Sequence, residues 1–187
     1  MKYINPDIES SYQENDLGQT LYNIVLERKP KKIVEIGVLH GYSTVAMAMA
    51  LDELGEGRII AYDLFEDYKF KHGTMGAVQA QLERYGIAKY VTLVKKDFDE
   101  WLAAPEQFDL LHLDISNKGD TIERLYVAVK DQVESGASVL FEGGSAERDE
   151  VEWMEKFHAR SIRSAQGVPF QVIDSRFPSL SEVRKMS

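Results

Sequence analysis

The sequence predicts an α/β fold with a doubly wound, mostly parallel seven-stranded sheet, and three observations support this prediction. Short apolar runs typical of buried strands alternate with longer segments whose apolar residues have helical spacing. Strands that are joined through helices in this way pair in parallel. Near the end of the chain, only SRFP separates two strand-like runs, which leaves no room for a helix. We therefore expect an antiparallel hairpin at one edge of the sheet.

The expected elements follow one another along the chain. An amphipathic helix that begins near Leu17 ends before Pro30. Strands are expected at residues 32–36, 58–63, 91–97, 108–114, 137–143, 169–174 and 179–185. Further helices are expected at residues 43–54, 77–86, 121–134 and 147–157, with a short one around residue 101. In the helix at 147–157, Val151, Met154 and Phe157 have the spacing of a core-facing stripe.

Length and composition predict the organisation of the chain. With 187 residues, 44% of them hydrophobic, it can form one sizeable core, so we expect a single domain over residues 1–187. Residues 1–16 are polar and acidic, which suits a lid and does not resemble a secretion signal. No apolar run reaches the roughly 18 residues of a membrane span. We therefore expect a cytoplasmic protein that does not contact membranes.

Charge and cysteine content exclude several kinds of site. The formal net charge of -9 disfavours nucleic acid as a partner, because phosphate backbones are bound mainly through clustered Lys and Arg. The absence of cysteine excludes disulfides, thiolate metal sites and a cysteine nucleophile. A small-molecule substrate is left as the expectation. A homodimer through the hairpin edge or the N-terminal segment is compatible with this composition.

The run VEIGVLHGYST, residues 34–44, is the expected ligand loop. In a doubly wound sheet, ligands bind beyond the carboxyl ends of the strands. Gly37 and Gly41 let the backbone turn and approach a ligand closely, and Ser43 at the start of the next helix favours an anionic group. Glu35 suits a ligand that also carries a cation. The glycine spacing fits neither the dinucleotide fingerprint nor the P-loop, so an oxidoreductase is only a minor alternative.

This loop resembles motif I of the class I S-adenosylmethionine-dependent methyltransferases. It is most similar to the small catechol-O-methyltransferase-like branch, whose bacterial relatives methylate sugars and other hydroxylated metabolites. The resemblance extends from about Leu17 to Lys185 and includes the terminal hairpin. It implies a Rossmann-like methyltransferase fold, S-adenosylmethionine as cofactor, and O-methylation of a small hydroxylated metabolite or sugar.

The resemblance also implies roles for residues of the glycine loop. Glu35 would orient the methionine ammonium of the cofactor, and the backbone from Gly37 to Gly41 would line it. Ser43 would bind the cofactor carboxylate at the helix N-terminus.

Acids after the later strands complete the cofactor site that the resemblance implies. Asp63 would hold the ribose, because a carboxylate accepts well from two neighbouring hydroxyls. Asp97 with Phe98 would border the adenine, and Asp114 would also contact the cofactor. From the residues alone, Asp63 could instead be a helix cap, and Asp97 a solvated loop charge.

A divalent cation is the second ligand that the resemblance suggests. In the metal-dependent branch, acids after the fourth and fifth strands hold Mg2+ or another divalent cation, and Asp114 and Glu142 match two of these ligands. Gly143 stands where the second ligand of the fifth strand would be an Asp or Asn. Since Mg2+ can use water for missing ligands, the departure weakens the expected metal site without removing it.

The catalytic base is expected in the loop after the fourth strand, together with Asp114. Lys118 lies one residue later than the lysine of catechol-type enzymes, and Asn117 occupies the equivalent position. Lys118 would act as the base if burial or the metal lowers its pKa, and it is otherwise a solvated lysine. Asn117 would complete a metal shell or bind the acceptor.

Histidines and aromatic residues supply the remaining candidates. His112 lies in an apolar run and is expected to be a core histidine. His40 in the glycine loop is a candidate contact for cofactor or acceptor. The irregular stretch after Asp63 contains Tyr68, His72 and further large side chains, namely Phe70 and Met75, and is a candidate lid or acceptor pocket.

Two alternatives share this fold. The first is a metal-independent methyltransferase that acts on nitrogen or oxygen. The second is a protein that binds the cofactor but has lost catalysis, as the glycine at 143 and the shifted Lys118 would suggest.

Overall fold

The structure is built on one sheet, with β1 and β4 near the middle of its parallel part. The computed structural model describes residues 2–116 and 118–185, and within them it contains one seven-stranded sheet of order β3-β2-β1-β4-β5-β7-β6. The first five strands pair in parallel, and β7 pairs antiparallel with both β5 and β6. The strands are β1 (Lys32–Ile36), β2 (Arg58–Asp63), β3 (Val91–Lys95), β4 (Leu110–Leu113), β5 (Ser138–Glu142), β6 (Phe170–Asp174) and β7 (Leu180–Arg184). The predicted fold class, with its terminal hairpin, is confirmed.

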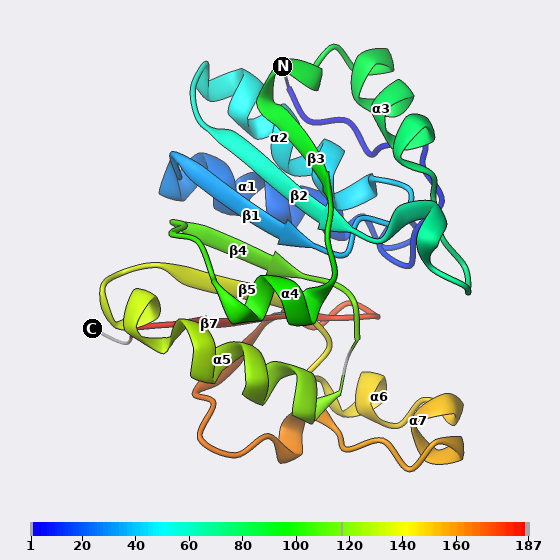
Figure 1. The fold of residues 1–187 in the computed structure, drawn as a ribbon, viewed down its shortest axis with the longest axis vertical. Helices are drawn as coiled ribbons and strands as arrows, with labels where there is room; N and C mark the ends of the chain where they lie inside the picture. The colour runs from blue at the N-terminus through cyan, green and yellow to red at the C-terminus, as the bar shows by residue number, and fades with distance from the viewer. Residues whose placement is uncertain (1, 117, 186–187) are drawn as a thin grey trace.

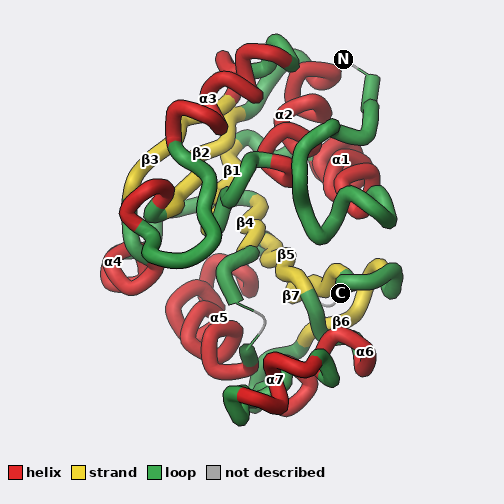
Figure 2. Tube along the Cα trace, turned by 90° about the vertical axis from the view of Figure 1, so that its right-hand side faces the viewer, coloured by secondary structure: helices red, strands yellow, loops and turns green. Residues whose placement is uncertain are grey.

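Helices cover both faces of the sheet, as Figures 1 and 2 show. One face carries α1, α2 and α3, and the other carries α4 and α5. Their bounds are α1 (Leu17–Arg28), α2 (Tyr42–Leu54), α3 (Met75–Arg84), α4 (Phe98–Ala103) and α5 (Gly119–Glu134); two short helices follow, α6 (Ala146–Asp149) and α7 (Glu152–Lys156). Among the described residues, no helix has both the length and the apolar character that crossing a membrane requires.

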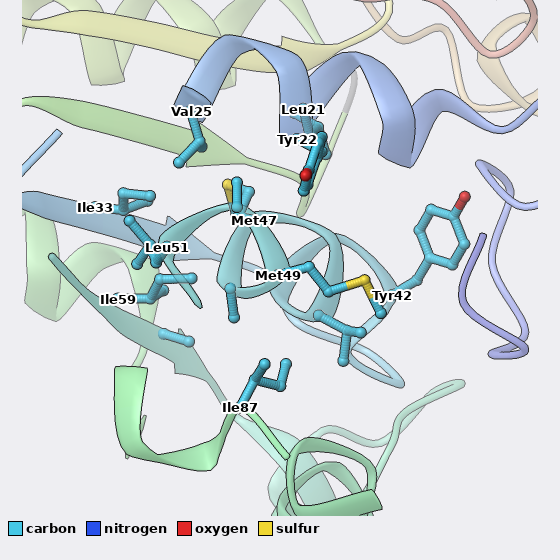
Figure 3. Packing of buried hydrophobic residues seen from close by; sticks show 14 of the residues in the cluster. Leu21, Tyr22, Val25, Ile33, Tyr42, Met47, Met49, Leu51, Ile59 and Ile87 are labelled. Carbon is cyan, nitrogen blue, oxygen red and sulfur yellow. The ribbon is translucent and has the colours of Figure 1, made fainter. Parts of the chain in front are cut away.

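The core forms as two clusters because side chains alternate along each strand. In β1, Ile33 packs with the α1 and α2 side, whereas Val34 packs with the α4 and α5 side. Helix α2 is apolar on nearly all sides and lies deep in the first cluster, where Met47 and Leu51 meet residues of α1, β1 and β2 (Figure 3). This packing fixes the start of α2 relative to the end of β1, and the glycine loop connects these two points.

The terminal hairpin is attached to the rest of the chain by polar contacts. Asp174 at the end of β6 accepts a hydrogen bond of 2.5 Å from Thr20 of α1. Arg176 donates to the same carboxylate, at 3.0 Å from Nε. In β7, the buried Glu182 forms an ion pair with Arg28 at the end of α1. The hairpin is therefore tied to the first helix, far away in the sequence.

The structure corrects the prediction of one helix at residues 147–157. The segment forms two short helices, and Val151 between them has an extended backbone. The buried carboxylate of Asp149 accepts from the backbone N–H groups of Ile162 and Arg163, at 3.3 and 3.0 Å, which fixes the end of α6. Met154 is buried as expected, but Phe157 is 66% exposed and does not face the core.

Candidate active site

Two cavities lie side by side beyond the carboxyl ends of the parallel strands. Their volumes are about 370 and 230 Å³. Both are lined by residues that follow β1 and β4, namely Gly37, Val38, Leu39, Asp114 and Ile115. The two cavities therefore share a wall. We refer to them as the larger and the smaller cavity.

The larger cavity contains the residues expected at an adenosine. Asp63 at the end of β2 lines it, as do Asp97 and Phe98 at the start of α4. Tyr68 and His72, from the irregular stretch after β2, line it as well. The structure thus brings together acids from two strand ends and aromatic rings. Such a lining suits a flat ring attached to a hydroxylated sugar.

The Asp63 carboxylate also holds the glycine loop in place. One of its oxygens accepts from the backbone N–H groups of Val38 and Leu39, at 2.6 and 3.1 Å. The other oxygen accepts from the N–H of Phe65 at 2.8 Å. Each carboxylate oxygen has two acceptor sites, so these three bonds leave one site, on the oxygen that binds Phe65, for a ligand hydroxyl. Asp63 therefore links the end of β2 to the loop after β1.

Gly37 is required by the close approach of two strand ends. Its φ is +93°, and a Cβ built at this position would lie 2.4 Å from the backbone oxygen of Asp114. Gly41, with φ of +89°, is the residue before α2, and a Cβ there would lie 3.1 Å from a side-chain carbon of Val78. Both glycines keep the backbone close to the cavities, although Gly41 is not part of either lining.

Glu35 lies behind the ligand loop. Its carboxylate is fully buried and accepts from the hydroxyl of Ser43 at 2.6 Å and from that of Thr44. Nδ1 of His112 lies 3.1 Å from the same carboxylate, and Nε2 lies 3.4 Å from the hydroxyl of Tyr12. His112 is thus the core histidine that the sequence predicted. Glu35 lines neither cavity, and its hydrogen bond from Ser43 links it to the smaller one.

The smaller cavity combines the start of α2 with segments remote in the sequence. Ser43, His40 and Asp114 form one side of it. Ser11 and its neighbours Glu9 and Ser10 come from the N-terminal segment. Glu142 at the end of β5 and Arg148 of α6 complete the lining. Hydroxyl, carboxylate and guanidinium groups dominate this cavity.

Asp114 and Glu142 are held by different environments. Loss of water around the Asp114 carboxyl raises its pKa well above the ordinary aspartate value, and the charges of Glu142 and Glu35 raise it further. Arg148 acts in the opposite direction. Glu142 is buried and accepts from Nε of Arg148 at 2.9 Å and from Ser11 at 3.0 Å. Its two oxygens are therefore both hydrogen-bonded within the chain.

These residues do not fit a divalent metal ion. Within residues 2–116 and 118–185, no group of three His, Cys, Asp or Glu side chains is arranged to hold one. Glu142 is paired with Arg148, and Gly143, with a φ of +98°, has no side chain that could supply a second ligand. The expected pair of ligands after β5 is thus replaced by an ion pair and a glycine.

The structure does not bring all predicted catalytic residues to the site. Lys118 is exposed at the start of α5 and lies outside the linings of both cavities, so its place does not support the role of a base. Asn117 lies outside the described residues. The sequence interpretation missed Arg148 and Ser11. The only signal for either was its position, shortly after a strand end or within a polar N-terminal segment.

Solved structures share this fold. An S-adenosylhomocysteine-bound methyltransferase from Podospora anserina has a TM-score of 0.66 and 16% identity, over 96% of this chain and 80% of that protein. An O-methyltransferase from Streptomyces achromogenes that is involved in tomaymycin synthesis was solved with S-adenosylmethionine. It has a TM-score of 0.64 and 18% identity, over 96% of this chain and 83% of that protein. An O-methyltransferase from Bacillus cereus in complex with S-adenosylhomocysteine has a TM-score of 0.64 and 16% identity, over 97% of this chain and 84% of that protein.

Sequence comparison establishes the family. The arrangement of sheet, glycine loop and strand-end acids defines a Rossmann-like methyltransferase fold. A family model described as a methyltransferase domain matches residues 34–142, which is more than half of the chain, and the chain therefore belongs to this methyltransferase family. No curated protein matches it in sequence. The resemblance inferred from the glycine loop is confirmed.

Proposed function

We propose that the protein is an S-adenosylmethionine-dependent O-methyltransferase that acts on a small hydroxylated metabolite or sugar. One observation carries this proposal: two cavities share the wall formed by Gly37 and Asp114. A methyl donor and an acceptor must meet in line, and adjoining cavities with a common wall allow this. The family and the cofactors bound by the solved neighbours support the same reaction.

The larger cavity fits the adenosine part of the cofactor. Asp63 would accept from a ribose hydroxyl, and Asp97 and Phe98 would border the adenine. Gly37 lets the loop after β1 pack directly on the backbone of Asp114, and these two residues form the wall that both cavities share. When bound, S-adenosylmethionine supplies a methyl group that is already activated for transfer.

The methionine part of the cofactor would reach the start of α2. Ser43 lines the smaller cavity there, and the first N–H groups of a 13-residue helix favour a carboxylate. Glu35 accepts from the Ser43 hydroxyl, so we propose that it positions Ser43 instead of contacting the cofactor ammonium. This modifies the role expected from the sequence.

The acceptor would occupy the rest of the smaller cavity. Its lining of hydroxyl, carboxylate and guanidinium groups suits a small molecule with several hydroxyls. Asp114, which lines both cavities, is the carboxylate placed to accept a hydrogen bond from the hydroxyl to be methylated. We propose that the chain forms a single domain in which the N-terminal segment, expected from the sequence as a lid, is a fixed cover over the acceptor, because Glu9 and Ser11 form part of the cavity wall and Tyr12 is fully buried. The homodimer and the cytoplasmic location stay predictions from the sequence.

Titration calorimetry tests the cofactor proposal. S-adenosylhomocysteine and S-adenosylmethionine should both bind to the wild-type protein, and NAD should not. The Asp63→Ala variant should lose this binding, whereas Asp67→Ala is a matched control, because Asp67 is exposed and pairs with Lys95 near the same strand end. If neither sulfur compound binds to the folded wild-type protein, the proposed function is wrong.

A further inference from the structure

Arg148 lies where its charge enters the acceptor side of the site. It belongs to α6, shortly after β5, and its side chain is 14% exposed and lines the smaller cavity. Its Nε and Nη2 atoms donate to one oxygen of Glu142, at 2.9 and 2.5 Å. The guanidinium carbon also lies 5.9 Å from the centre of the Phe177 ring in the terminal hairpin. Contacts on two sides thus hold the guanidinium in place.

The carboxylates around Arg148 would repel one another without a cation. Glu142 is buried, and its charge acts on the partly buried carboxyl of the neighbouring Asp114. A buried charge needs a partner, and Arg148 supplies one positive charge. A guanidinium stays protonated at any pH at which proteins are folded, so this positive charge is permanent.

Among the described residues, the same contacts reduce the oxygen ligands that Glu142 can offer a metal ion. A hard divalent cation requires several oxygen ligands, which usually include carboxylates. Arg148 and Ser11 together occupy three of the four acceptor sites of the Glu142 carboxylate. Gly143 has no side chain that could supply a ligand, and it is held by hydrogen bonds to Ser179 and Ser181.

We propose that Arg148, paired with Glu142, takes the place of a divalent cation, so that this methyltransferase binds its acceptor without a metal. The guanidinium presents several N–H donors in one plane, which suits an oxygen of the acceptor. The acceptor class is therefore a hydroxylated molecule whose oxygen accepts from a guanidinium, and two vicinal hydroxyls that chelate a metal are not required. The part of the proposal that concerns the acceptor rests on the proposed function.

Calorimetry with the metal alone tests this inference. MnCl2 or MgCl2 is titrated into EDTA-treated, dialysed protein. Wild-type protein should give no saturable binding up to millimolar concentrations. The Arg148→Ala variant frees the Glu142 carboxylate beside Asp114, and should show saturable Mn2+ binding with a Kd at least about tenfold below the highest concentration tested with wild type. Adding Glu142→Gln to this variant should abolish the gained binding.

Matched controls separate a local effect from damage to the fold. Arg163 pairs with another buried acid, Asp149 at the end of α6, and neither residue lines the larger or the smaller cavity. The Arg163→Ala variant should therefore gain no Mn2+ binding. Circular dichroism verifies that each variant is folded. If Arg148→Ala does not fold, Arg148→Gln replaces it, because glutamine keeps hydrogen-bond donors without the charge.

Two results would overturn the inference. One is saturable Mn2+ binding to wild-type protein that Glu142→Gln abolishes. The other is a folded Arg148 variant that gains no Mn2+ binding. Binding of S-adenosylhomocysteine is measured separately in the same samples, so a failure of the proposed function and a failure of the metal-free site give different results.

Discussion

The two cavities of the site differ in how the chain builds them. The larger cavity is lined by residues between 36 and 115, from the central strands and the loops that follow them. The smaller cavity also uses these loops, but it adds residues 9–11 from the N-terminal segment and Glu142 and Arg148 from the region after β5. The cofactor side is therefore built from one continuous part of the chain, and the acceptor side from three parts far apart in the sequence.

The two sides also differ in the groups that hold them together. On the cofactor side, the Asp63 carboxylate binds backbone N–H groups, and Gly37 packs directly on the backbone after β4. On the acceptor side, side chains bind other side chains, as Arg148 and Ser11 do with Glu142. The few residues that hold a backbone frame, such as Gly37 and Asp63, have no equivalent substitute, whereas one side-chain pair can be exchanged for another. We infer that substitutions should be more severe on the cofactor side.

The largest effect is expected for Gly37→Ala. The new Cβ would lie 2.4 Å from the Asp114 carbonyl oxygen, and alanine would be strained at φ of +93°. Strain and overlap together should cost about 3 kcal/mol or more in the free energy of unfolding. Urea unfolding measures this loss, and Gly86→Ala is the control, since φ is +70° there with open space around it. Equal losses for the two variants would contradict the close packing at Gly37.

Asp63→Asn should have the next largest effect. The amide keeps the size of the side chain but loses the charge that accepts from the N–H groups of Val38 and Leu39. Hydrogen bonds to a charged group contribute about 1.5–3 kcal/mol, so affinity for S-adenosylhomocysteine should fall roughly 10- to 100-fold. Calorimetry measures the affinity. An unchanged affinity would mean that Asp63 shapes neither the loop nor the ligand contact.

Ser11→Ala should affect the acceptor side only. It removes one hydrogen bond to Glu142, which corresponds to about 1 kcal/mol of stability. Thermal unfolding measures this change, and affinity for S-adenosylhomocysteine should change less than about twofold. A large loss of cofactor affinity would contradict the division of the site into two separately built sides.

The smallest effect is expected for Asp174, whose hydrogen bonds with Thr20 and Arg176 attach the terminal hairpin to α1. Burial raises the pKa of Asp174, but hydrogen bonds from Arg176 and Thr20 outweigh it, so the pKa lies below the ordinary aspartate value. Because the pKa is lower in the folded protein, the ionised Asp174 stabilises the fold at pH values above the ordinary aspartate pKa. This contribution is lost as the pH falls through the lowered pKa.

Urea unfolding at pH 6 and at pH 3 measures the contribution of Asp174. Wild-type protein should be more stable than Asp174→Asn at pH 6 by less than about 1 kcal/mol, because Arg176 is partly exposed. The difference should shrink toward pH 3. A difference that grows with acidification would contradict the sign of the shift.

The fold was predictable because its signals are local. The strands came within about two residues of their predicted bounds, since apolar runs between glycines, prolines and charged residues determine them. The helix at 147–157 was wrong because Asp149 is fixed by backbone groups of Ile162 and Arg163, and no local pattern reports such a contact.

The candidate site was predictable on the cofactor side and less so on the acceptor side. Gly37, Asp63 and Asp97 follow strands directly, so their meeting at one edge follows from the parallel topology. Glu35 was expected to face the ligand, but it is buried opposite His112 of β4 in the sheet register. Arg148 depends on a side-chain contact with Glu142, which sequence patterns do not reveal.

The complete burial of Tyr12 has a consequence for how ligands enter and leave. Its ring is 0% exposed and packs in the core beside Tyr42 and His112. Withdrawing the N-terminal segment would expose this whole ring, at a cost of about 2 kcal/mol or more. Residues 66–72 are exposed, and the Lys71–Glu9 ion pair, at 2.6 Å, joins them to that segment. We expect the residence time of a bound ligand to follow the opening of residues 66–72, with the N-terminal segment as the fixed side of the passage.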